Sequence, residues 1–175
     1  MESASELRER LDAGHRRLFL LLSGVTEEQF KRRPPATPND PRPWSIAEVL
    51  AHLLDGERLW AGRIASALAE DGAAITPSPP EAHDEGARAG RLAPVPQLIH
   101  GVLGARRETE KLLAKASRAD GSLLPNTLWH PRLGQRLDLA WMFDKVAAHF
   151  AEHCEHVEAL RAAAGARVVT EGGAR

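Results

Sequence analysis

Four segments of this chain repeat apolar residues at the spacing of an α-helix, and stretches without that pattern separate them. They cover about residues 5–23, 45–72, 95–117 and 138–164. No segment alternates apolar and polar residues convincingly, so no strand is predicted. Alanine, leucine and arginine dominate and tyrosine is absent, a composition that favours helix. The sequence therefore predicts an all-α protein built as a four-helix bundle.

Residues typical of helix starts support three of the predicted boundaries. The stretch "SIAE" at Ser45 to Glu48 is a capping box for the second segment. The stretch "TEEQ" at Thr26 to Gln29 has the same form and predicts an extra short helix after the first segment. Asp138 is the expected N-cap of the fourth segment.

The connections differ in length and composition. Residues 34–43 hold five prolines and are predicted to form a loop. Residues 73–93 and 118–137 lack apolar periodicity and are expected to be long connections without regular structure. The long connection at 73–93 would permit neighbouring helices to run parallel. We expect one domain over residues 1–164 and a disordered tail at 165–175.

Charge and cysteine content exclude several classes of protein. The chain has 23 Lys plus Arg against 24 Asp plus Glu, and no basic stripe interleaved with aromatics, so nucleic-acid binding is not expected. Cys154 is the only cysteine, which rules out an intrachain disulfide and favours a reducing compartment. No signal peptide or membrane-spanning stretch is recognisable. We therefore expect a cytoplasmic protein without a membrane partner.

Three histidines cluster on one face of the fourth helical segment. His149, His153 and His156 share the apolar side of that helix with Met142 and Leu160. Buried imidazoles need a hydrogen-bond partner or a metal, because each has at least one polar ring nitrogen. Any single one could be a core-edge histidine bonded to a neighbouring helix. The pair at i and i+4, His149 and His153, could instead chelate one divalent ion.

A third ligand is expected from a facing helix. His52 in "WSIAEVLAHLL" is the best candidate, because it lies at the edge of the apolar arc of the second segment. Taken alone, it would be interpreted as a boundary histidine. The remaining four are weaker: His15 and His100 lie on other helical segments, and His83 and His130 lie in predicted loops, where His130 is expected to order its own turn.

Two blocks of the sequence resemble the DinB-like superfamily of metal-binding four-helix bundles. They are "WSIAEVLAHLLDGERLW" at 44–60 and "HPRLGQRLDLAWMFDKVAAHFAEHCEHV" at 130–157. The resemblance implies an up-down-down-up bundle, frequently a homodimer, that holds zinc, nickel or another divalent ion, with iron or manganese also possible. It places the metal ligands on His52, His149 and His153 and leaves His156 outside the triad. Relatives include mycothiol-dependent maleylpyruvate isomerases and bacillithiol S-transferases.

Three neutral imidazoles would leave a divalent ion with open coordination positions, as in catalytic sites. Water or a thiol that binds such an ion loses its proton more readily, so the sequence is compatible with a hydrolase or a thiol S-transferase acting on a small molecule, with a low-molecular-weight thiol as a possible cosubstrate. The alternative is a non-catalytic, dimeric helical binding module with a structural metal or none.

Other polar residues have roles that the sequence leaves open. Glu48 is a weak candidate for a base, because its capping role already explains it. Glu57 falls on the apolar arc and predicts an internal pair with an arginine. Cys154 points away from His153 and is expected to pack against the first helix or a second subunit. Four arginines could hold the carboxylates of a thiol, although surface or paired roles are expected for them: Arg58, Arg63, Arg106 and Arg107.

Overall fold

Four long helices make up the bundle in the computed structural model, which describes residues 3–75 and 80–165. They are α1 (Ala4–Leu22), α3 (Ile46–Ala69), α5 (Val95–Ala116) and α6 (Leu139–Ala163). A short helix, α2 (Glu27–Lys31), follows α1. The predicted helical bundle is confirmed. Among the described residues, none of the helices combines the length and the apolar character that a bilayer span requires.

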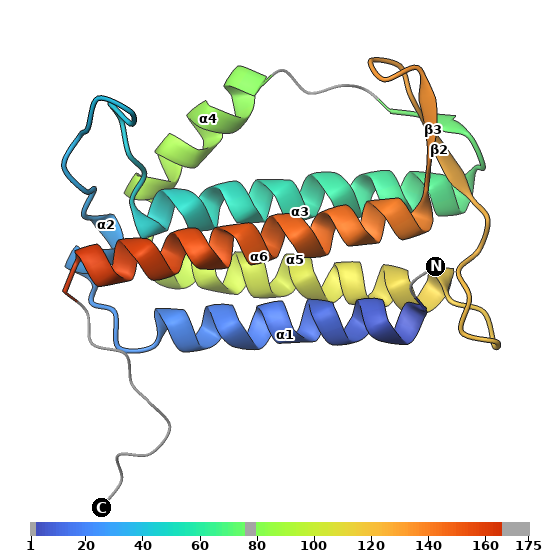
Figure 1. The fold of residues 1–175 in the computed structure, drawn as a ribbon, viewed down its shortest axis with the longest axis horizontal. Coiled ribbons are helices and arrows are strands. Elements are labelled where there is room, and N and C mark those ends of the chain that lie inside the picture. Colours follow the sequence, from blue (N-terminus) through green and yellow to red (C-terminus); the bar gives the residue numbers. More distant parts are fainter. Residues whose placement is uncertain (1–2, 76–79, 166–175) are drawn as a thin grey trace, which may run out of the picture.

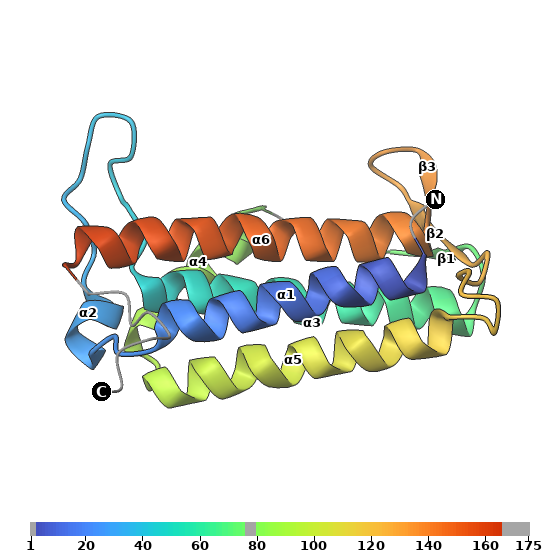
Figure 2. The same cartoon turned by 60° about the horizontal axis from the view of Figure 1, so that its bottom comes forward.

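The helices follow an up-down-down-up order. Figure 1 shows α1 and α6 running in one direction and α3 and α5 running in the other. Helix α3 packs against α5 and α6, and α1 packs against the other sides of α6 and α5, as Figure 2 shows from a second side. The parallel pair α3 and α5 needs a connection that returns along the whole bundle, which is why the chain has a long segment between them.

The starts of the helices are fixed by local hydrogen bonds. Ser45 accepts from the backbone of Glu48, whose carboxylate accepts in turn from the backbone amide of Ser45 at 2.8 Å. Thr26 and Gln29 form the second predicted capping box. Asp138 caps α6 by accepting from the amide of Trp141 at 2.7 Å. These three sequence predictions are confirmed.

Two apolar clusters fill the bundle, one towards each end. One contains Leu50, Val102 and Phe150, and the other contains Leu11 and Phe143. Both clusters draw residues from α1, α3, α5 and α6, so each helix is held at both ends. This packing fixes the rotation of α3 and α6 about their own axes, and therefore the direction of every side chain between them.

The expectation of unstructured connections is wrong in two places. Residues 73–93 contain a two-residue strand, β1 (Ala73–Ala74), a helix, α4 (Pro80–Ala89), and a short 3₁₀ helix, η1 (Gly90–Leu92). Helix α4 and η1 lie on α3 through glycines: an added Cβ at Gly86 of α4 would lie 2.7 Å from Asp55 Oδ2, and one at Gly90 of η1 would lie 2.2 Å from the Cβ of Ala51. Close approach of two backbones requires small residues, so α4 lacks the stripe of large apolar residues that a periodicity search would detect.

Residues 118–137 hold most of a hairpin, which the sequence did not predict. Strands β2 (Thr127–His130) and β3 (Gln135–Asp138) pair antiparallel, and β1 pairs parallel with β2. Only one residue of each hairpin strand is buried against the helices, Leu128 and Leu137. An alternation this short is too weak a signal to predict a strand. The predicted tail lies outside the described residues from residue 166 onwards.

Candidate metal centre

The three predicted ligands meet where α3 and α6 pack side by side. These helices are antiparallel neighbours. His52 of α3 faces His149 and His153, which lie one turn apart on α6. His149 Nε2 lies 3.1 Å from His52 Nε2 and 3.1 Å from His153 Nε2. One ligand atom from each of the three lies within 4.8 Å of the others. The structure thus brings together the three histidines that the sequence selected.

The spacing of these nitrogens fits one shared cation. Two nitrogens that bind an ion at about 2.0–2.1 Å with tetrahedral or octahedral angles lie about 2.8–3.4 Å apart. The contacts to His149 Nε2 fall in this range. Hydrogen bonds alone fit less well, because one imidazole nitrogen carries either one proton or one lone pair and cannot bond fully to two neighbours. A cation would accept the lone pairs of all three rings.

The surroundings of the cluster disfavour the protonated form of two of its histidines. Burial, together with the neighbouring imidazoles of His149 and His52, lowers the pKa of His153 to about 3. Burial also lowers the pKa of His156. His153 Nδ1 is buried and has no hydrogen-bond partner among the described residues. At neutral pH His153 therefore presents an unprotonated nitrogen, which is the form that binds a metal.

Two neighbours hold the imidazoles in place. The Trp44 ring lies 5.0 Å from the His52 ring and is stacked at 6.5 Å on the His156 ring, between centroids. On the other side Gly56, one turn after His52, lets the His149 ring approach the backbone of α3. A Cβ at Gly56 would lie 2.9 Å from His149 Cε1. His156 thus lines the cluster through Trp44 and does not contribute to the group of converging ligand atoms.

Glu48 is held by contacts of its own. Arg33 donates from Nε to Oε2 at 2.9 Å and from Nη2 to Oε1, and the Ser45 hydroxyl donates to Oε2 at 2.8 Å. Burial raises the pKa of the Glu48 carboxyl, but these partners outweigh it and the net shift is downward. A carboxylate with a lowered pKa is a weak base. A catalytic role for Glu48 stays a prediction.

The other histidines lie apart from the cluster. His15 of α1 faces Glu110 of α5 at 3.9 Å. His100 lines a surface depression between α3 and α5. His130 accepts from the Leu133 amide through Nδ1 at 3.2 Å, and so orders its turn as predicted. The side chain of His83 lies outside the described part of the chain.

Cys154 and Glu57 have the packing roles that the sequence indicated. Cys154 Sγ lies 3.8 Å from the Gly14 carbonyl of α1, and burial raises the pKa of its thiol to about 11. Glu57 pairs with Arg106 at 2.7 Å and accepts from Thr109 at 3.0 Å. The expectation that Arg106 lies on the surface or in a surface pair is wrong: its side chain is 1% exposed, because Glu57 compensates its charge inside the core.

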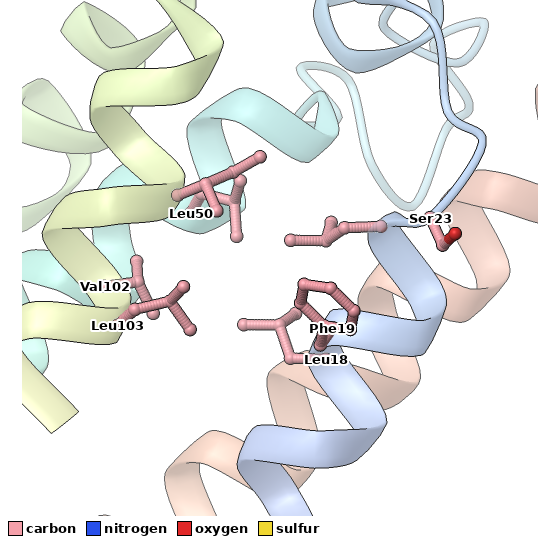
Figure 3. A pocket seen from close by; sticks show the side chains of 8 residues that line it. Leu18, Phe19, Ser23, Leu50, Val102 and Leu103 are labelled. Carbon is pink, nitrogen blue, oxygen red and sulfur yellow. The ribbon is translucent and has the colours of Figure 1, made fainter. Parts of the chain in front are cut away.

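An apolar hollow between α1 and α5 is separate from the histidines. Figure 3 shows it, with Leu18 and Phe19 of α1 facing Val102 and Leu103 of α5. Its volume is about 130 Å³, and the one polar side chain in its lining is that of Ser23. With no titratable or metal-binding group in its lining, this hollow offers no catalytic chemistry.

Comparison with known proteins agrees with the fold. The sequence model of the DinB superfamily matches residues 3–157. The chain belongs to the DinB superfamily. No match was found among curated proteins. The chain is similar in structure to YfiT from Bacillus subtilis, described as "a probable metal-dependent hydrolase with an unusual four-helix bundle topology", with a TM-score of 0.74 and 18% identity, over 95% of this chain and 92% of YfiT.

Two residues of this DinB-superfamily site have roles that the sequence did not reveal. Trp44 is part of the block that carries the family resemblance, but its contacts with the His52 and His156 rings depend on the path of the preceding loop. One sequence feature could have indicated the role of Gly56: it is a glycine in the middle of a predicted helix, one turn after a candidate ligand. Such a glycine is unfavourable for the helix and suggests a close approach of another group.

Proposed function

We propose that this protein is a divalent-metal-dependent enzyme in which His52, His149 and His153 hold the ion and the substrate is a small molecule. The observation that carries the proposal is the convergence of three ligand atoms within 4.8 Å. The description of YfiT as a probable metal-dependent hydrolase supports it. The donor set of three imidazoles suits zinc or nickel best, and iron or manganese are also compatible.

The residues of the chain prepare the site in three ways. Burial keeps His153 unprotonated, so its lone pair is available at neutral pH. Gly56 and Trp44 orient the rings of His149 and His52 from opposite sides. The three ligands all come from rigid helices, so the site needs little rearrangement to accept an ion.

Three neutral ligands define the chemistry that follows. A divalent ion bound by them keeps its full positive charge and open positions, and it lowers the pKa of a water or a thiol that binds there. Hydrolysis and thiol S-transfer are therefore both accessible. The printed description of YfiT favours hydrolysis, and the low-molecular-weight thiol remains part of the proposal as the cosubstrate of the transferase alternative.

Elemental analysis of the purified protein, followed by activity screens, tests the proposal. We expect about one divalent ion per chain in the wild type and none in His149→Ala. His15→Ala is the matched control, because it removes a histidine outside the cluster. Ester and amide substrates would report hydrolysis, and a thiol panel with a generic electrophile would report transfer, each with and without chelator. Protein that holds no stoichiometric metal, or turnover that survives in His149→Ala, would contradict the proposal.

A further inference from the structure

The contact between α3 and α6 continues beyond the histidines to a pair of tryptophans. Trp60 of α3 meets Trp141 of α6 edge to face, with ring centroids 5.8 Å apart. Trp60 follows His52 by eight residues, and Trp141 precedes His149 by eight residues. Since the helices are antiparallel, the tryptophan pair lies about 12 Å along the same seam from the metal centre. Trp141 is 40% exposed, so this part of the seam reaches the surface.

Arg63 lies over the Trp60 ring of this pair. Its guanidinium carbon is 4.7 Å from the centroid of the Trp60 ring. Arg63 and His52 lie within about 20° of each other around the axis of α3, because 11 residues make about three turns. Helical side chains lean towards the N-terminus, and the contact with Trp60 shows that Arg63 does so. The guanidinium therefore leans along the seam towards the histidines.

Arg63 is a half-buried cation that forms no ion pair with a described carboxylate. Its Nε is buried and has no hydrogen-bond partner among the described residues. Burial alone lowers the pKa of its guanidinium, without a nearby charge to oppose the shift. The other three arginines considered as carboxylate ligands have different environments. Arg106 is paired with Glu57 in the core, and Arg58 and Arg107 are exposed. A partly buried cation is costly when one of its hydrogen-bond donors stays unsatisfied, so a ligand that completes the guanidinium would stabilise it.

We propose that Arg63, held on Trp60, binds the anionic group of the substrate or cosubstrate whose reactive end lies at the metal centre. This inference rests on the proposed function. The planar guanidinium would bind a carboxylate through two parallel hydrogen bonds. The distance along the seam selects an elongated ligand with its carboxylate about 12 Å from the reacting atom. The tryptophan pair would pack against the apolar part of the ligand near that carboxylate.

Binding of simple thiols to the Co²⁺-loaded protein tests this inference without any turnover. The probes are mercaptoundecanoate, the neutral mercaptoundecanol of equal length, and the short acid mercaptopropionate. The change in the absorption spectrum of the bound Co²⁺ reports each affinity. We expect the wild type to bind the long acid at least about tenfold more tightly than the long alcohol. The short acid cannot reach Arg63 and should gain nothing over a short alcohol.

Variants test whether Arg63 causes the preference for the long acid over the long alcohol. Arg63→Met keeps a long apolar side chain over Trp60 and should bind the long acid and the long alcohol equally, with unchanged affinity for the alcohol. Arg63→Gln provides the same comparison with a polar side chain, should the methionine variant not fold. Arg58→Met is the matched control, an exposed arginine on the same helix, and should keep the full preference.

The possible failures are distinguishable. Wild-type protein that binds Co²⁺ and thiols but shows no preference for the long acid contradicts the role of Arg63 and leaves the metal centre standing. A preference that persists in both Arg63 variants contradicts it equally. Protein that binds no Co²⁺, or whose bound Co²⁺ responds to no thiol, contradicts the proposed function and this inference together.

Discussion

Replacing Gly56 by alanine separates the stability of the fold from the geometry of the metal centre. A Cβ at this position would lie 2.9 Å from His149 Cε1 and 3.5 Å from Nδ1. Carbon atoms in ordinary contact lie about 3.5–4.0 Å apart, so the ring has to move by about 0.5–1 Å. The obstacle is the end of a side chain, which can rotate at little cost to the fold. The same rotation displaces a proposed metal ligand.

The two expected effects have opposite signs. In a helix interior, alanine is more favourable than glycine by about 1 kcal/mol. We therefore expect the metal-free Gly56→Ala protein to be as stable as the wild type, or up to about 1 kcal/mol more stable. Metal–ligand distances tolerate only about 0.2 Å of change, and disturbing the support of a ligand typically costs about 10–100-fold in metal affinity. We expect a loss of Zn²⁺ affinity in that range.

Gly62→Ala is the matched control, because an added Cβ there meets no atom within 4 Å and Gly62 lies on the same helix. It should gain about 1 kcal/mol of stability with unchanged Zn²⁺ affinity. Urea unfolding of the metal-free proteins gives the stability, and competition with a chromophoric chelator gives the affinity. The reasoning is refuted if Gly56→Ala binds Zn²⁺ as tightly as Gly62→Ala does.

Three further predictions concern pH, the buried ion pair and the tryptophan beside the site. In the metal-free folded protein the pKa of His153 is lowered from 6.5 to about 3, so between these pH values only the unfolded state binds a proton at this residue. The free energy of unfolding should therefore fall as the pH drops from about 6.5 towards 3. In urea titrations at several pH values, His153→Gln should show a shallower loss. Glu57→Gln leaves the Arg106 cation uncompensated in the core and should lower the free energy of unfolding by about 3–5 kcal/mol. The double variant with Glu57→Leu and Arg106→Met removes both charges, so it should lose less free energy of unfolding than Glu57→Gln alone. Trp44→Ala should weaken Zn²⁺ binding in calorimetric titrations because the ring no longer restrains His52, and Trp44→Phe, which keeps an aromatic ring, should bind more tightly than Trp44→Ala.

The parts of the fold that the sequence predicted depend on neighbours in the chain. The periodicity of α1, α3, α5 and α6 and the capping residues Ser45 and Asp138 act within a few positions of themselves. The family resemblance added the up-down-down-up order. Helix α4, the 3₁₀ helix η1 and the hairpin escaped prediction because their stabilising contacts come from distant residues, such as Ala51 beneath Gly90 of η1. The buried position of Arg106 escaped for the same reason, since an internal carboxylate decides it.

At the metal centre, the sequence by itself determined that His149 and His153 lie one turn apart, because helical spacing is a local property. The sequence also indicated His52 as a third ligand, because of the motif that contains it and its position at the edge of an apolar arc. Only the tertiary structure decided that the three rings converge, since this depends on which faces of α3 and α6 meet and how closely Gly56 lets them approach. The tertiary structure also decided that Arg63 is half-buried without an ion pair to a described carboxylate, whereas Arg106 is paired in the core, because exposure and pairing are set by packing between helices.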